Sequence, residues 1–226
     1  MTRVNVLCED RTGGGLAAVL QSASNRRRAA EGKSRLSFAP PGTVLNNHKL
    51  IDKCAGYDLL RFRSQPRFDH VYYVVDAKQL WDVDAVGLVP PQPNEPAPEF
   101  LARAQKAAYG AMSSRARGAR DDVQWAEISA GFHPCVLMWE RESLILPVAD
   151  ALGLGVPELS SDEVRRADGW VDNRFKQHLK GKYNKATDGI RLLKRIAESN
   201  ELTERVLRAN ASLLEIVTSM VELPDA

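Results

Sequence analysis

The chain has 226 residues, of which 44% are hydrophobic and 27% are charged, and its formal net charge is +2. This length and apolar content are sufficient to bury a full core, and so small a net charge does not by itself indicate a nucleic-acid-binding protein. No apolar segment approaches the roughly 20 residues of a membrane-spanning helix. The 3 cysteines are scattered without metal-ligand spacing. We therefore expect a cytoplasmic protein without a membrane partner.

The first two thirds of the chain alternate segments typical of strands and helices. In chain order, we first expect a strand over 3–8, a glycine turn over 13–15, a helix over 16–28 and a short strand over 36–38. A helix over 47–63, a strand over 70–75 and a proline-rich connector over 88–98 follow. The last elements are a helix over 99–117, strands over 124–129 and 134–138, and a helix over 140–152. Such an alternation predicts the α/β class, with a mainly parallel, Rossmann-like sheet that carries helices on both faces.

The strand signals stop after Gly155. Ser160 and Glu163 form a capping pattern, and the sequence then predicts helices over 161–167, 172–180, 187–198 and 202–221. We therefore expect an α/β domain over 1–154 and a basic, helical C-terminal region over 155–226.

Isolated acidic residues follow three of the predicted strands. Glu9 follows the run 4–8, Asp76 follows 71–75, and Glu140 and Glu142 come directly after 135–139. The carboxyl ends of neighbouring parallel strands open into one crevice, where carboxylates distant in sequence can share a divalent metal ion. Taken singly, each acid is better explained as a solvated residue at a strand end or in the first turn of a helix.

The order of these acidic motifs resembles the Toprim superfamily. The first motif reads Leu7-Cys8-Glu9-Asp10-Arg11-Thr12, in which Glu9 and Thr12 match the family and Asp10 stands where the family has glycine. The middle motif of the family is Asp-x-Asp, and here it reads Asp76-Ala77-Lys78, with Asp82 or Asp84 as a substitute for the missing second acid. The third motif reads Trp139-Glu140-Arg141-Glu142-Ser143 and keeps both acids.

A fourth stretch is similar to the basic helix and Gly-Tyr-x-Lys segment of a Toprim-like family that is encoded beside OLD-type ATPases in prokaryotic defence loci. It includes Gly181, Lys182, Tyr183, Asn184 and Lys185. The resemblance covers roughly 3–198 and lies in the order and spacing of the motifs.

This resemblance implies a metal-dependent nuclease that cleaves DNA or RNA in defence against phages and mobile elements. Glu9 and Asp76 would be the catalytic residues, and Glu9, Asp76, Glu140 and Glu142 would bind Mg²⁺ or Mn²⁺. The implied partners are nucleic acid and an ATPase of the OLD/ABC type, and a homo-oligomer is compatible with the sequence.

Two other functions stay open. Because Lys78 and Asp10 replace groups of the family pattern, the chain could be a catalytically degenerate subunit that binds nucleic acid or a partner ATPase. The glycines 13–15 could instead form part of a nucleotide-binding turn, although they lack the lysine of a P-loop and the spacing of a dinucleotide fingerprint.

The segment 170–195 is strongly basic, which is typical either of contact with phosphate backbones or of a solvated basic face. Trp170, Phe175 and Tyr183 are available there for packing or for stacking on bases. The residues that we predict to bind nucleic acid are Arg174, Lys176, Lys180, Lys182 and Lys185. The histidines are scattered along the sequence, and neither a zinc site nor a Ser-His-Asp triad is expected.

Overall fold

The fold is taken from a computed structural model of the chain. It describes residues 1–9, 14–40, 46–65, 67–78, 80–154, 159–175 and 183–225, and for residues 161, 162, 168, 175, 185 and 186 it describes the backbone alone. No helix in these ranges is both long and apolar enough to cross a membrane.

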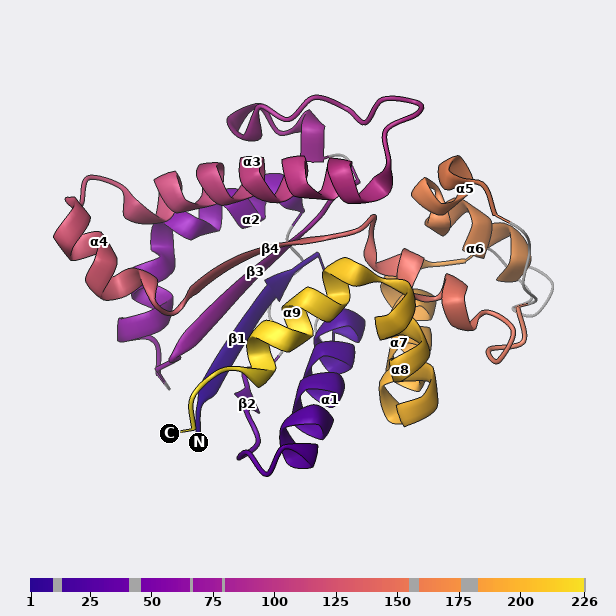
Figure 1. Cartoon of the computed structure of the whole chain (residues 1–226), viewed down its shortest axis with the longest axis horizontal. Helices are drawn as coiled ribbons and strands as arrows, with labels where there is room; N and C mark the ends of the chain where they lie inside the picture. Colours follow the sequence, from indigo (N-terminus) through magenta and orange to yellow (C-terminus); the bar gives the residue numbers. More distant parts are fainter. Residues whose placement is uncertain are drawn as a thin grey trace.

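A parallel sheet forms the centre of the described structure (Figure 1). Its strands are β1 (Arg3–Cys8), β2 (Ser37–Phe38), β3 (His70–Asp76) and β4 (Phe132–Leu137), in the spatial order β2-β1-β3-β4. All three pairings are parallel, with Cys8 of β1 opposite Val74 of β3 and Asp76 of β3 opposite Leu137 of β4. The central strands therefore end together, at the same edge of the sheet.

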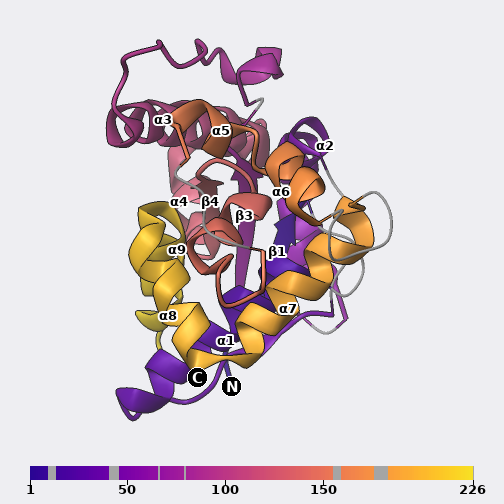
Figure 2. The same ribbon diagram turned by 90° about the vertical axis from the view of Figure 1, so that its right-hand side faces the viewer.

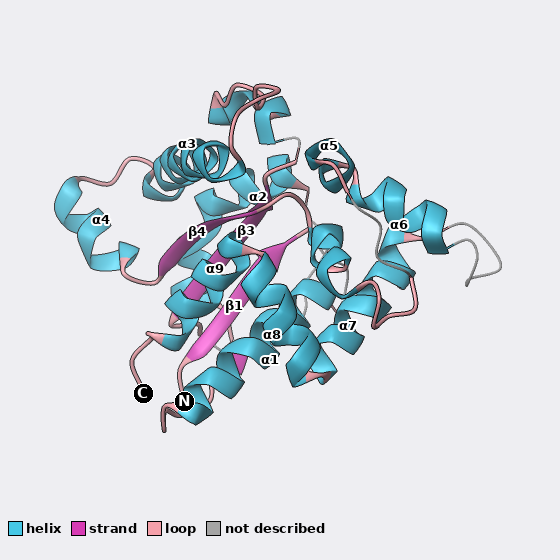
Figure 3. Cartoon of the chain, turned by 45° about the vertical axis from the view of Figure 1, so that its right-hand side comes forward, coloured by secondary structure: helices cyan, strands magenta, loops and turns pink. Residues whose placement is uncertain are grey.

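Helices cover both faces of this sheet, as the colouring by secondary structure shows (Figure 3). One face carries α2 and α3 and the other carries α1, α7, α8 and α9, with α5 and α6 beyond the carboxyl ends of the strands. The bounds of the helices are α1 Gly15–Ala30, α2 Asn47–Lys53, α3 Ala97–Arg117, α4 Asp122–Ser129, α5 Ser161–Arg165, α6 Ala167–Phe175, α7 Ile190–Glu198, α8 Asn200–Ala209 and α9 Ala211–Val221.

Shorter helical segments connect these elements. The 3₁₀ turns are η1 Cys54–Gly56, η3 Leu80–Asp82, η4 Asp84–Val86, η5 Arg141–Leu144 and η6 Leu146–Val148, and the segments of π-helix are η2 Leu59–Arg63 and η7 Lys185–Gly189.

Strand β3 is buried on both sides, which explains why its sequence is a continuous apolar run. Tyr72 and Val74 belong to the core beneath α1 and α9, whereas Val71, Tyr73 and Val75 belong to the core beneath α2 and α3. Alternate side chains of a strand point to opposite faces, so one strand contributes to two hydrophobic clusters. The predicted α/β class, with a parallel sheet between helical layers, is confirmed.

The C-terminal helices complete one of these layers. Helices α7 and α9 pack along α1, and Leu193 and Val217 lie in the same core as Leu20 of α1 (Figure 2). At the crossing of α1 and α7, a Cβ atom on Gly15 would lie 2.7 Å from the Cβ atom of Leu193. This distance is shorter than two carbon atoms tolerate, so the two backbones approach closely because residue 15 is glycine.

Arg28 joins the end of α1 to the C-terminal segment of the chain. Its fully buried guanidinium donates hydrogen bonds to the carbonyl oxygens of Ser34 (2.7 Å), Val221 (3.0 Å) and Leu223 (2.6 Å), and it pairs with the Asp225 carboxylate. The hydrogen bonds to carbonyls at and beyond the carboxyl end of α9 place a positive charge at the negative end of that helix dipole.

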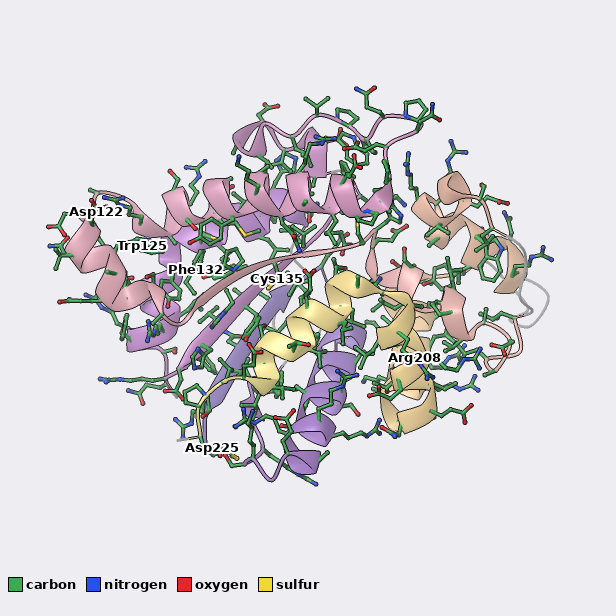
Figure 4. The ribbon with its side chains drawn as sticks, in the orientation of Figure 1. Asp122, Trp125, Phe132, Cys135, Arg208 and Asp225 are labelled. Atoms are coloured by element: carbon green, nitrogen blue, oxygen red, sulfur yellow. The ribbon has the colours of Figure 1, made fainter. Side chains whose placement is uncertain are left out.

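Several segments differ from the sequence-based prediction. The single helix predicted over 202–221 is two helices, α8 and α9, which are separated at Asn210, and the helix predicted over 47–63 is α2 followed by η1 and η2. The strand predicted over 124–129 is wrong, because this segment is helix α4: the Asp121 side chain accepts a hydrogen bond from the backbone of Gln124 and caps the helix. Trp125 and Ile128, three residues apart on α4, pack against the core, and the Trp125 ring meets Phe132 of β4 edge-on at 5.7 Å (Figure 4).

The helix predicted over 140–152 is also wrong. The segment forms η5 and η6, followed by turns up to residue 154. Arg141, Glu142, Ser143 and Leu144 are all buried, so this segment has no solvent-facing side. An amphipathic surface helix has one polar and one apolar face. A segment that is enclosed on every side has no polar face, and its conformation is set by the residues that surround it.

Candidate functional site

The acidic residues at the three strand ends lie in one region of the structure. Glu9 follows β1, Asp76 is the last residue of β3, and Glu140 follows β4 after two further residues. The segments beyond β3 and β4 stay paired, because the backbone amide of Lys78 donates to the carbonyl of Trp139 at 2.8 Å. The parallel register therefore directs these acids to the same edge of the sheet.

The site is buried. Asp76 is 7% exposed, Glu140 is 1% exposed and Glu142 is 0% exposed. Burial raises the pKa of the Asp76 carboxyl well above its usual range, and the negative charges of Glu9, then Glu142 and Glu140, raise this pKa further, while Arg141 acts in the opposite direction. Like charges gathered in a low-dielectric site disfavour ionisation in this way.

Two cations lie among these carboxylates. The Lys78 ammonium is 2.8 Å from Oε1 of Glu140. The Arg141 guanidinium donates from Nε to Oε1 of Glu142 at 3.0 Å and from Nη1 to the backbone carbonyl of Glu9 at 2.8 Å. Arg141 thus joins the end of β1 to the segment that follows β4.

The C-terminal region also contributes to the site. The Tyr183 hydroxyl is 3.2 Å from Oε1 of Glu142, and the Tyr183 backbone amide donates to the Asp172 carboxylate at 2.8 Å. A Cβ atom on Gly189 would lie 2.5 Å from the Tyr183 hydroxyl and 3.2 Å from Oε1 of Glu142. Glycine at 189 therefore leaves the room that the contact between Tyr183 and Glu142 needs.

Tyr183 has a different position from the one expected for base stacking. Its side chain is 7% exposed and belongs to the core beneath α1, so its ring is already covered by protein. Burial, followed by the Glu142 charge, raises the pKa of Tyr183, which keeps its hydroxyl protonated as a donor to the carboxylate. The expectation of packing is met, whereas stacking on bases is excluded for this residue.

Asn47 holds the backbone of Asp76. Its amide nitrogen donates to the Asp76 carbonyl at 2.8 Å, and its amide oxygen accepts from the Asp76 backbone amide at 3.1 Å. Both hydrogen bonds use backbone atoms of Asp76, so Asn47 fixes the backbone that carries the carboxylate without contacting the carboxylate itself. The sequence analysis did not predict a role for Asn47. A signal was present, because Asn47 lies in the first turn of a predicted helix that leads into the strand ending at Asp76.

Several other candidates lie outside the site or outside the described residues. Asp82 and Asp84 are exposed in η3 and η4, and neither is among the charges that raise the pKa of Asp76. Of the predicted nucleic-acid-binding residues, Arg174 is exposed near the end of α6, and Lys185 is described by its backbone in η7. Lys176, Lys180 and Lys182 lie outside the described residues.

Sequence reasoning also missed a pair of histidines at the other end of the sheet. Nδ1 of His70 lies 3.0 Å from Nε2 of His133, and the His133 ring stacks on Tyr72 with 4.3 Å between centroids. Burial, followed by the charges of His70 and Arg61, lowers the pKa of His133 to about 4. The parallel register of β3 and β4 brings the two rings together, and spacing in the sequence does not show it.

The donor set at the strand ends suits a hard divalent cation. In the described ranges, no three His, Cys, Asp or Glu side chains are already arranged to hold a metal ion. Mg²⁺, however, usually keeps several waters and binds through one or two carboxylates, and Glu9 and Asp76 supply two. If all four carboxylates are ionised, Lys78 and Arg141 leave two negative charges unbalanced, which one divalent ion would balance.

No protein-family model and no curated protein matches the sequence. One similar solved structure is described as the C-terminal region of the Xanthomonas campestris pv. campestris OLD protein, phased with platinum. The two chains are 12% identical, with a TM-score of 0.33 over 97% of this chain and 94% of that chain.

Proposed function

We propose that the chain is a metal-dependent phosphodiester hydrolase of the Toprim type, in which Glu9, Asp76, Glu140 and Glu142 form the cation site. The observation that carries this proposal is the meeting of acidic residues from the ends of three neighbouring parallel strands, β1, β3 and β4. Structural carboxylates at a surface are normally solvated, whereas burying several together is costly unless a cation compensates them.

Each residue has a distinct part in this proposal. Glu9 and Asp76 would hold the ion directly, and Glu140 and Glu142, held by Lys78 and Arg141, would set the negative field around it. A bound Mg²⁺ or Mn²⁺ would polarise the scissile phosphate and lower the pKa of a bound water. Glu9, which is less buried than the other three, is the carboxylate best placed to accept a proton from that water.

The substrate and the biological setting are inferred from the resemblance of the sequence motifs to the Toprim-like family. The basic residues Arg174, Lys176, Lys180, Lys182 and Lys185 would contact the phosphate backbone of DNA or RNA, and such contacts would make binding salt-dependent. An ATPase of the OLD/ABC type is the proposed partner, in defence against phages and mobile elements.

A second function is favoured by one specific observation. Lys78 and Arg141 already neutralise Glu140 and Glu142, so the site contains part of its own counter-charge. A catalytically degenerate Toprim-fold subunit, which binds nucleic acid or a partner ATPase without cleaving, would need no more than this.

Cleavage assays with a metal titration separate the two functions. The purified chain is incubated with labelled single-stranded and double-stranded DNA and RNA, with Mg²⁺, with Mn²⁺ or with EDTA. The nuclease should cleave only when Mg²⁺ or Mn²⁺ is present. Glu9→Gln and Asp76→Asn should each reduce the cleavage rate by at least about 100-fold. Asp84→Asn, which changes an exposed acid on η4, is the matched control and should keep the wild-type rate.

The degenerate subunit would give the opposite pattern. It should shift the nucleic acid in a binding assay and show no cleavage with either metal. Cleavage that survives both Glu9→Gln and Asp76→Asn would exclude this site as its origin.

A further inference from the structure

Lys78 stands where the Asp-x-Asp pattern that this sequence resembles has its second acid. It lies two residues beyond Asp76, and its backbone is fixed on both sides: its amide donates to the carbonyl of Trp139 at 2.8 Å and its carbonyl accepts from Asn47 at 3.4 Å. The chain turns just beyond the end of β3, and the Lys78 ammonium lies 2.8 Å from Oε1 of Glu140. The side chain of Lys78 therefore extends toward the acids.

The Lys78 ammonium uses the carboxylate that a second cation would need. It lies 2.8 Å from Oε1 of Glu140, and the side chains of Lys78 and Glu140 are 22% and 2% exposed. The mostly buried Lys78 ammonium would repel a divalent ion placed beside it, because water screens two positive charges less in such a site than at the surface. The Glu140 carboxylate thus already has a positive partner within hydrogen-bonding distance.

The remaining acids are sufficient for one ion. Arg141 pairs with Glu142 at 3.0 Å. Among the described residues, no lysine or arginine side chain forms an ion pair with the remaining two carboxylates, Glu9 and Asp76. Two-metal phosphoryl-transfer sites place their ions roughly 4 Å apart on shared carboxylates. Here a side-chain cation, the Lys78 ammonium, already lies against one of the four carboxylates.

We propose that Lys78 replaces the second divalent ion of this site, so that the chain binds one divalent cation through Glu9 and Asp76 while the Lys78 ammonium supplies the other positive charge beside Glu140. This inference rests on the proposed function, since it assumes that the acidic site binds metal. It states how many ions bind and which residue sets that number.

The stoichiometry of Mn²⁺ binding tests the inference without an activity assay. Isothermal titration calorimetry gives the number of ions per chain, and electron paramagnetic resonance distinguishes an isolated Mn²⁺ from two ions close enough for their spins to couple. The wild-type chain should bind one ion with an uncoupled spectrum. Lys78→Met removes the charge at similar length, and it should allow a second ion and a coupled spectrum.

Two further variants complete the test. Lys78→Met combined with Glu140→Gln should bind one ion again, because the carboxylate released by the first change is then lost. Lys106→Gln, which removes an exposed lysine on α3, is the matched control and should keep one ion.

The outcomes separate the inference from the function on which it rests. Two coupled ions in the wild-type chain would overturn the inference and leave the metal-dependent function intact, and this result does not depend on the folding of any variant. A single ion in both the wild-type chain and Lys78→Met would also overturn the role of Lys78. No ion in any of the chains would refute the metal site itself.

Discussion

Asn47 and Asp76 are joined by a pair of hydrogen bonds between a side-chain amide and a backbone peptide group, at 2.8 and 3.1 Å. This contact connects the first residue of α2 to the last residue of β3. A bonded carboxamide that is 7% exposed fixes the direction in which the strand presents the Asp76 side chain.

Replacing Asn47 with alanine should therefore affect both stability and metal binding. We expect Asn47→Ala to lower the free energy of unfolding by about 1–3 kcal/mol, because it leaves buried backbone groups of Asp76 without partners. The neighbouring Asn46→Ala removes a helix cap from α2 and should cost about 1 kcal/mol. Urea denaturation measures both losses, and only Asn47→Ala should also weaken Mn²⁺ binding in calorimetry. Equal Mn²⁺ affinity in the two variants would contradict the positioning role of Asn47.

Asp76 should reduce stability in the absence of metal. A carboxyl whose pKa is raised in the folded chain contributes stability below its unfolded pKa, and this contribution is lost as the pH rises through the folded pKa. At neutral pH with EDTA, Asp76→Asn should therefore raise the free energy of unfolding by about 1–2 kcal/mol. Asp84→Asn should change it by less than about 0.5 kcal/mol.

Metal should reverse this order. Adding Mg²⁺ should stabilise the wild-type chain, since a ligand that binds the folded state alone raises its unfolding free energy, and it should leave Asp76→Asn unchanged. Thermal melts with and without Mg²⁺ measure the difference. A wild-type chain that is more stable than Asp76→Asn in EDTA would show that the buried charge is compensated in another way.

The contact between Tyr183 and Glu142 depends on the glycine at position 189. Gly189→Ala would place a methyl group 2.5 Å from the Tyr183 hydroxyl. We therefore expect the free energy of unfolding to fall by about 1–3 kcal/mol and metal binding to weaken. Gly110→Ala is the matched control, because nothing lies within 4 Å of the added Cβ atom. Because residue 110 lies in the interior of helix α3, Gly110→Ala should raise the free energy of unfolding by about 0.5–1 kcal/mol. Similar melting curves for the two variants would contradict the close packing at position 189.

Arg28 should be far more important for stability than its neighbour Arg27. Arg28→Met leaves several carbonyl oxygens and the Asp225 carboxylate without their buried donor, and we expect a loss of about 3–5 kcal/mol. Arg27 pairs with Glu204 at the surface at 2.9 Å, so Arg27→Met should cost at most about 1 kcal/mol. Denaturation curves of the two variants, measured side by side, test this contrast.

The histidine pair should make the chain sensitive to acid. The pKa of His133 is lowered from 6.5 to about 4, so the folded chain favours the neutral ring and loses stability as the pH falls from 6.5 toward 4. His133→Phe keeps a ring to stack on Tyr72 and should flatten the pH dependence of the melting temperature over this range. Glu222 is also close to Tyr72 but does not belong to the histidine pair. Glu222→Gln is therefore a control, and its melting temperature should depend on pH as that of the wild-type chain does.

The sequence was sufficient to predict the strands that carry the site. Apolar runs such as 71–75 are long enough and rich enough in β-branched residues to indicate buried strands, and an acid at the end of each run marks one edge of a parallel sheet. The segment 124–129 shows the limit of this approach: its apolar residues suit either a strand or a short helix, and a cap at Asp121 decides between them.

The interior of the site could not be predicted in the same way. The ion pairs of Lys78 and Arg141 depend on side-chain conformations that form only when β3 and β4 lie side by side. Likewise, the positions of Tyr183 and Gly189 depend on how α7 packs on α1, a contact between segments about 175 residues apart. Sequence periodicity describes each element singly and contains no information on such crossings.

The two ends of β3 respond to protons in opposite directions. At its first residue, His70 and its partner favour a neutral ring, so acid works against the folded chain there. At its last residue, acid relieves the crowding of charge around Asp76. One strand thus sets an acid limit and an alkaline limit to the range in which the metal-free chain resists unfolding, and a cation bound at the alkaline-sensitive end would extend that range upward only.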